Sequence, residues 1–128
     1  MRLLVRAAII GTTAAVLATT ASTSAMAEDA TVYSAGLGAK VKWVAYGDHL
    51  YITDQVADGS SAVATYQMGS GTQYFYWNSK GKGTTRHVDL DVPENRLIAV
   101  GAMSGEWQGT PTGGLDWNSI STTTVSTS

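Results

Sequence analysis

The residues with the clearest potential for metal chemistry are three aspartates in the middle of the chain. Asp54 and Asp58 lie at the ends of the short segment DQVAD, and Asp48 precedes them. Calcium takes about six to eight oxygen ligands, and two carboxylates on one loop, with backbone carbonyls, would begin such a site. The spacing does not match the EF-hand pattern, and aspartate also accepts backbone N–H groups in turns. We therefore interpret all three as turn residues, with calcium as the alternative and no other cofactor predicted.

Aromatic residues suggest a second kind of chemistry, the stacking of rings on sugars. The chain has four tryptophans and six tyrosines but one phenylalanine. Tyr74 and Tyr76 share one face of a predicted strand, Trp107 lies in a glycine-rich loop, and Trp117 lies near the end of the chain. A row of such rings on a sheet face would form a flat platform for a glycan. The alternative is that these residues fill the core in place of phenylalanine.

Catalytic and zinc motifs are weak in this sequence. There is no glycine-x-serine-x-glycine motif, and His49 and His87 lie far apart in the sequence with no close ligand pair. Alternation along their strands predicts that both histidines face outward, and it places Asp89 on a solvent-facing side as well. We therefore predict that the protein is not an enzyme, and a small hydrolase ranks third among the hypotheses.

The N-terminus has the three parts of an export signal. Arg2 and Arg6 supply positive charge, residues 7–18 are mostly apolar, and Ala25-Met26-Ala27 is a small-x-small cleavage site. The apolar run is about a dozen residues, whereas a membrane span needs about 20. The sequence therefore predicts a signal peptide at 1–27, a secreted domain at 28–128, and no membrane segment in the mature protein.

The composition of the predicted mature chain limits its partners. Without the two leader arginines it has 6 basic and 10 acidic residues, so it is mildly acidic. Nucleic-acid binding requires a basic surface, and the only clustered cations are Lys80, Lys82 and Arg86. There is no cysteine, so the domain must be stable through packing and hydrogen bonding alone. We expect a monomer that binds an extracellular glycan or protein, and no nucleic acid.

The elements that must position these residues are strands. Residues 40–66 form three alternating runs, with Val41, Trp43 and Ala45 on one face of the first. Gly47-Asp48 is a hairpin signal, and a second turn follows at Asp58-Gly59. The segments TQYFYWN (72–78) and TTRHVDLDV (84–92) continue the strand pattern.

The remaining segments complete a prediction of seven to eight short strands. Residues 31–33 form a first edge strand, and residues 97–103 are expected to form a hairpin with residues 84–92. We expect a short last strand at 115–120, followed by a Ser/Thr-rich tail that is either loose or an edge strand. Val88, Leu90 and Val92 are predicted to lie in the core. This pattern predicts an all-β, single antiparallel β-sandwich of immunoglobulin-like or jelly-roll kind.

The segments GDHLYITDQVADGSSAVATY and NSKGKGTTRHVDLDVPEN support a resemblance. In them the chain resembles small secreted actinobacterial proteins with a leader and a single β domain. The resemblance covers most of the mature chain and implies export and an all-β fold, but no activity and no site residues.

These observations lead to a functional hypothesis. We expect a secreted, non-enzymatic binding domain that recognises extracellular polysaccharide or cell-envelope material. The alternative is an inhibitor of a secreted hydrolase, which would present the loop at 78–83 or the glycine-rich segment at 105–114.

Overall fold

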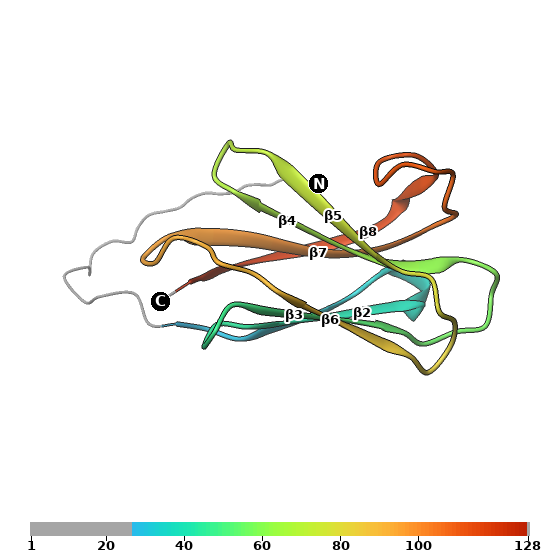
Figure 1. Ribbon diagram of the computed structural model, residues 1–128, viewed down its shortest axis with the longest axis horizontal. Coiled ribbons are helices and arrows are strands. Elements are labelled where there is room, and N and C mark those ends of the chain that lie inside the picture. The colour runs from blue at the N-terminus through green and yellow to red at the C-terminus, as the bar shows by residue number, and fades with distance from the viewer. Residues whose placement is uncertain (1–26, 128) are drawn as a thin grey trace.

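The computed structural model describes residues 27–127, which form two four-stranded antiparallel sheets packed face to face (Figure 1). The all-β fold and the β-sandwich predicted from the sequence are confirmed. The predicted leader lies outside the described residues except for Ala27. No helix among the described residues is long and apolar enough to cross a membrane.

The first sheet has the strand order β1-β2-β3-β6, and the second has the order β5-β4-β7-β8. A single 3₁₀ turn, η1 (Ala35–Leu37), joins β1 to β2. The strands of the first sheet are β1 (Ala30–Tyr33), β2 (Ala39–Val44), β3 (His49–Asp54) and β6 (Thr85–Asp89). Those of the second are β4 (Ser61–Met68), β5 (Gln73–Asn78), β7 (Leu97–Gly105) and β8 (Leu115–Ser126).

The β2–β3 hairpin forms where the sequence predicts it. Trp43 pairs with Leu50, and the connecting residues 45–48 contain two positive φ angles, 89° at Gly47 and 59° at Asp48. Glycine adopts this conformation without steric cost, and aspartate tolerates it better than most residues. The turn residues therefore fix the register, so that the apolar side chains of both strands face the core.

The turn predicted at Asp58-Gly59 leads from β3 to β4 in the opposite sheet. The predicted hairpin between residues 84–92 and 97–103 is wrong, because β6 pairs with β3 whereas β7 pairs with β4 and β8. Alternation is the same whichever sheet a strand joins, so it could not distinguish a hairpin from a crossover.

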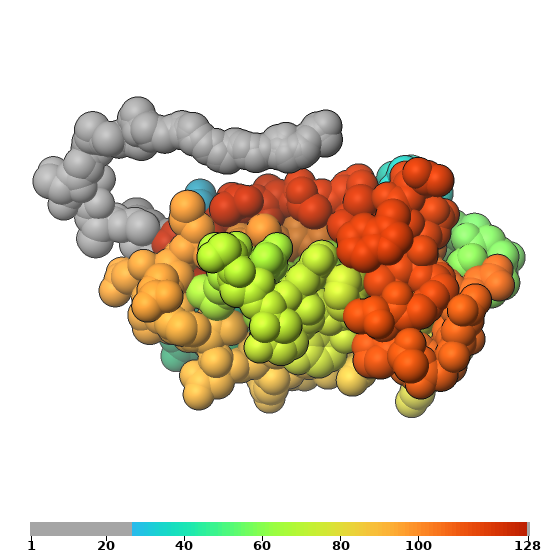
Figure 2. All heavy atoms as spheres, turned by 90° about the horizontal axis from the view of Figure 1, so that it is seen from above, coloured from blue at the N-terminus to red at the C-terminus, as the bar shows by residue number. Residues whose placement is uncertain are grey.

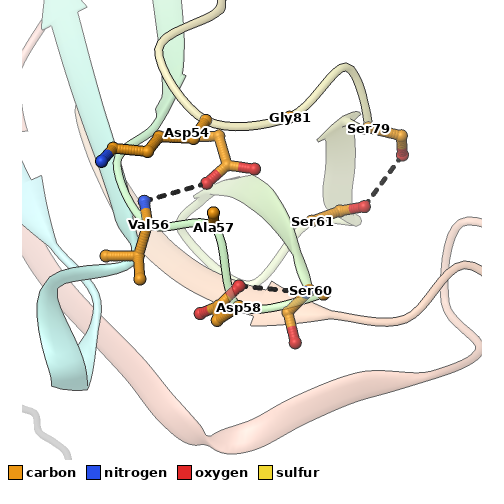
Figure 3. Close-up of a pocket in the computed structure, with 10 residues that line it drawn as sticks. Asp54, Val56, Ala57, Asp58, Ser60, Ser61, Ser79 and Gly81 are labelled. Atoms are coloured by element: carbon orange, nitrogen blue, oxygen red, sulfur yellow. Dashed lines mark hydrogen bonds between the residues drawn. The ribbon is translucent and has the colours of Figure 1, made fainter.

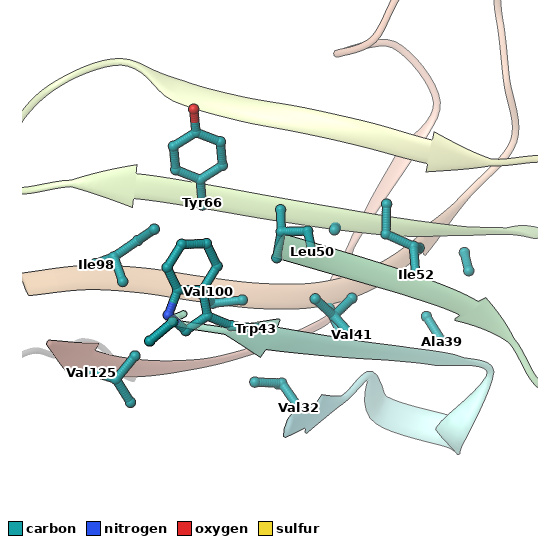
Figure 4. Packing of buried hydrophobic residues seen from close by; sticks show 14 of the residues in the cluster. Val32, Ala39, Val41, Trp43, Leu50, Ile52, Tyr66, Ile98, Val100 and Val125 are labelled. Carbon is teal, nitrogen blue, oxygen red and sulfur yellow. The ribbon is translucent and has the colours of Figure 1, made fainter. Parts of the chain in front are cut away.

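The main core fills the space between the sheets (Figure 4). Trp43, Leu50 and Ile52 from the first sheet pack in the same cluster as Ile98 and Val100 from the second, and all five are fully buried. Each such side chain contributes about 1.5–3 kcal/mol by leaving water. This packing is the principal stabilising feature of a domain without disulfides.

The predicted core strand at residues 84–92 needs correction. Val92 is buried, but Val88 and Leu90 are only half-buried against the cluster. The strand is shorter than predicted, ending at Asp89, and it forms an edge of its sheet. An edge strand has a neighbour on one side only, which leaves part of each side chain uncovered.

The Ser/Thr-rich tail is an edge strand, the second of the two predicted alternatives, and it is not loose. β8 is the longest strand of the described chain and pairs with β7 through Ser126. Beyond it, the Thr127 amide donates to the Arg96 carbonyl at 2.8 Å, and its hydroxyl donates to the Pro93 carbonyl at 2.8 Å. Threonine is β-branched and favours extended backbone, so a polar tail can still complete a sheet edge.

Candidate binding surfaces

The outer face of the second sheet carries a second apolar cluster. Phe75 and Trp77 point away from the main core, opposite to Tyr74 and Tyr76, as the alternation of the strand predicts. Val63 pairs with Trp77 on one side and with Met103 on the other, so these buried side chains form a row across three strands. β4 is therefore buried on both faces, which the sequence did not indicate.

The β7–β8 loop, residues 106–114, is tied to this outer face. The Trp77 indole Nε1 donates to the Pro111 carbonyl at 2.9 Å, and the Glu106 amide donates to the Gly114 carbonyl at 2.9 Å. Gly105 makes the packing possible, because a Cβ atom there would lie 2.7 Å from the Trp77 ring. The loop is therefore held by a side chain of β5 as well as by its own backbone.

Two half-exposed tryptophans lie on this surface, one in the loop and one in β8. Trp107 is 52% exposed and Trp117 is 53% exposed. Trp107 contacts Trp77 edge to face at 5.2 Å between ring centroids, and Trp117 contacts Phe75 in the same manner at 5.8 Å. Such contacts orient the rings while leaving much of each surface in solvent. Figure 2 shows this side of the molecule, where the orange-red segment around residues 106–118 lies beside β5.

The structure places the other two predicted binding residues elsewhere. Tyr74 and Tyr76 are on the inner face of β5 and stack with Tyr66, at 5.0 and 6.2 Å between ring centroids. Burial, followed by the neighbouring phenols of Tyr76 and Tyr74, raises the pKa of Tyr66 to about 12. Tyr74 lines a hollow of about 270 Å³ together with Asp91. The predicted row of four rings is therefore two separate pairs on opposite faces of one sheet.

The acidic loop forms a shallow hollow of about 360 Å³ lined by Asp54, Asp58 and nearby serines (Figure 3). The Asp54 carboxylate accepts from the Val56 amide at 3.2 Å, and the Asp58 carboxylate accepts from the Ser60 amide at 3.0 Å. Both contacts close local turns around the carboxylates.

Asp48 does not join the other two predicted calcium ligands. It lies before the first residue of β3, whereas Asp54 is the last, which separates them by roughly 20 Å of extended chain. Asp48 is 8% exposed, and its carboxylate accepts from the Val92 amide at 3.2 Å. The three aspartates therefore lie at two ends of the sheet, and each carboxylate accepts a backbone N–H group there.

A different cluster of potential metal ligands lies on the solvent face of the first sheet. His49 pairs directly with Asp89 in the β3–β6 register, and His87 lies diagonally opposite, beside Tyr51. The His49 Nδ1 atom is 2.7 Å from Asp89 Oδ1 and 2.8 Å from His87 Nε2. Both histidines face outward as predicted, but no local pattern indicated that they meet. The missing information was the pairing of β3 with β6 across 38 residues.

The predicted inhibitor loop at residues 78–83 is anchored by a buried side chain. Asn78 is 2% exposed, and its amide nitrogen donates to the carbonyls of Ile52 and Thr84 at 2.9 Å each. Its side-chain oxygen accepts from the Lys80 amide at 3.1 Å. The loop is therefore preorganised, although no described contact identifies a target, and the inhibitor hypothesis stays a prediction.

Arg86, which shares one face of β6 with Val88, contacts the neighbouring sheet. Its Nη1 donates to the Trp77 carbonyl at 2.7 Å, and its guanidinium lies 5.7 Å from the Tyr76 ring centroid. The long side chain thus reaches from an edge of one sheet to β5 of the other.

Comparisons with protein-family models, curated proteins and solved structures found no match to this chain. Function therefore has to be inferred from the residues of the chain and their geometry. Among the described residues, the surface around Trp107 and Trp117 and the His49, His87 and Asp89 cluster are the two arrangements with specific chemistry.

Proposed function

We propose that this protein is a secreted, non-enzymatic, monomeric domain that binds extracellular polysaccharide through the outer face of its second sheet. The observation that carries the proposal is the pair of half-exposed indoles, Trp107 and Trp117, each held edge to face against a more buried aromatic ring. Apolar C–H faces of sugar rings stack on such surfaces.

The fixed orientation of the rings favours binding. An aromatic side chain has few rotatable bonds, and a ring that is already oriented loses little further freedom when a ligand covers it. Gln108, the exposed neighbour of Trp107 in the loop, carries an amide that can hydrogen-bond sugar hydroxyls. The surface thus combines a stacking platform with a polar side chain beside it.

The proposal can be tested by retention on insoluble polysaccharides such as cellulose, chitin and peptidoglycan. We expect at least one of these to retain the protein, and we expect Trp107→Ala and Trp117→Ala each to reduce retention by about 10-fold or more, because a buried stacking contact is worth about 1–3 kcal/mol. The matched control is Tyr46→Ala, which removes a 92% exposed ring from the β2–β3 loop. Unchanged retention in both tryptophan variants, or equal loss in the control, would contradict the proposal.

Export is supported by the leader pattern and has its own test. Mass spectrometry of the protein recovered from culture medium should give a chain that begins at Glu28, because small residues at positions 25 and 27 fit the cleavage site. Recovery of the uncut chain from the cell interior alone would contradict export.

A further inference from the structure

The cluster of His49, His87 and Asp89 has the spacing of ligands around a single metal ion. Its three converging atoms are separated by 2.7, 2.8 and 3.7 Å. Zinc bonds of about 2.0–2.1 Å to nitrogen and oxygen place tetrahedral ligand atoms about 3.3 Å apart, and the observed separations bracket that value. The cluster therefore needs little rearrangement to coordinate an ion.

Hydrogen bonding alone does not satisfy the three atoms. A ring nitrogen carries at most one proton, so His49 Nδ1 either donates or accepts. If His49 Nδ1 donates to Asp89, the His87 nitrogen at 2.8 Å must either accept the same proton or point its own N–H at that N–H group. If it accepts from His87, its lone pair faces the carboxylate oxygen at 2.7 Å. A cation among the three atoms removes the conflict, because each then directs a lone pair at it.

Neighbouring residues fix the direction of both imidazole rings. His87 stacks on Tyr51 at 4.7 Å between ring centroids and 12° between planes. His49 directs its other nitrogen, Nε2, at Gly47, where a Cβ atom would lie only 2.5 Å away. The absence of a side chain at Gly47 thus allows the His49 ring to present Nδ1 to the cluster.

From this geometry we propose that His49, His87 and Asp89 bind one divalent zinc ion on the solvent face of the first sheet. Two imidazoles and one carboxylate suit zinc and related transition metals, whereas calcium and magnesium prefer oxygen ligands. The three side chains are 28%, 43% and 72% exposed, so solvent reaches the site and supplies the remaining ligand. The ion would also link β6, an edge strand, to β3.

Calorimetric titration of the untagged, metal-free protein with Zn²⁺ tests the proposal. We expect one ion per chain and a melting temperature that rises with Zn²⁺, because the site exists only in the folded state. His87→Ala and Asp89→Asn should weaken binding by about 100-fold or more, since even the loss of outer partners of a metal ligand costs about 10–100-fold. Asp91→Asn is the matched control, because Asp91 is an exposed carboxylate outside the cluster.

Three outcomes would overturn the proposal. The first is that Zn²⁺ at about 1 mM does not saturate the protein, since a dissociation constant of that size corresponds to only about −4 kcal/mol of binding free energy. The others are an unchanged Zn²⁺ affinity in both ligand variants, and an equal loss of Zn²⁺ affinity in Asp91→Asn. Circular dichroism establishes that each variant is folded. If His87→Ala does not fold, Asp89→Asn decides, because it keeps the shape of the side chain. A tag containing histidine must be absent, because it would bind zinc itself.

A pair of glycine variants tests the positioning of His49 separately. Gly47→Ala and Gly59→Ala both place alanine at a positive φ, 89° and 80° respectively, so the backbone strain should be similar in the two variants. Only the methyl group at residue 47 meets the His49 ring, since nothing lies within 4 Å of a Cβ atom at Gly59. Zn²⁺ affinity should therefore fall in Gly47→Ala and persist in Gly59→Ala, and equal affinities would remove the positioning role of Gly47.

Discussion

Replacing Trp77 by phenylalanine tests how the outer aromatic surface is held together. Trp77 is 7% exposed and connects the buried row of the second sheet to the β7–β8 loop through its bond to the Pro111 carbonyl. Phenylalanine keeps an aromatic ring at this position but removes the indole N–H. The substitution therefore removes the tie of the loop while preserving the character of the strand.

The expected cost follows from the two contacts that are lost. A net hydrogen bond contributes about 0.5–1.5 kcal/mol, and its partner Pro111 is an exposed residue. The smaller ring leaves space beside Gly105, for which we add up to about 1.5 kcal/mol. The free energy of unfolding should therefore fall by about 0.5–3 kcal/mol, with roughly 4–8 °C lost in melting temperature for each kcal/mol.

Urea or thermal unfolding followed by circular dichroism measures this change, and polysaccharide retention measures its effect on Trp107. Retention should fall, because the loop that carries Trp107 loses its link to β5. Trp117→Phe is the stability control, since Trp117 is 53% exposed and surface changes usually stay within about 0.5 kcal/mol. If the two variants were equally stable, the Trp77 bond and its packing would not stabilise this surface.

Two further predictions concern stability. Tyr66 has a pKa raised from 10.0 to about 12 in the folded protein, so the tyrosine loses its proton at a lower pH in the unfolded chain than in the folded one. The free energy of unfolding should therefore decline between about pH 10 and 12, by at most about 1.4 kcal/mol per pH unit. Tyr66→Phe should flatten that decline in unfolding experiments, and an unaltered slope would assign it to other groups. Ile98 is fully buried, so Ile98→Ala should lower the free energy of unfolding in urea by about 2–5 kcal/mol. Leu97 is 64% exposed, so Leu97→Ala should change it by less than about 0.5 kcal/mol. Similar costs for both variants would contradict the assigned faces of β7.

Alternation of residues predicted the local structure well. Val41 and Trp43 face the core while Lys40 and Lys42 do not, and Leu50 and Ile52 follow the same rule in the next strand, as their spacing predicts. The glycine-aspartate turn predicted the hairpin between them. These features depend on neighbours in the chain, because side chains on a strand alternate between its faces and turns require particular backbone angles.

The candidate sites depended on information that is absent from local sequence. Alternation places His87 and Asp89 on one face of β6, but His49 joins them only because β6 pairs with β3. Trp107 was predicted as a binding residue, but its contact with Trp77 requires the loop to fold back over the outer face of the sheet.

Residue types and their alternation were enough to predict that this chain forms strands, where most of them lie, and which face of each is apolar. Strand pairing established which sheet each strand joins, that the polar tail completes the second sheet, and that the predicted aromatic residues separate into two pairs on opposite faces. A period of two specifies a face but not a partner. Partner choice depends on the burial of whole surfaces, and it is this choice that brings distant histidines or indoles together.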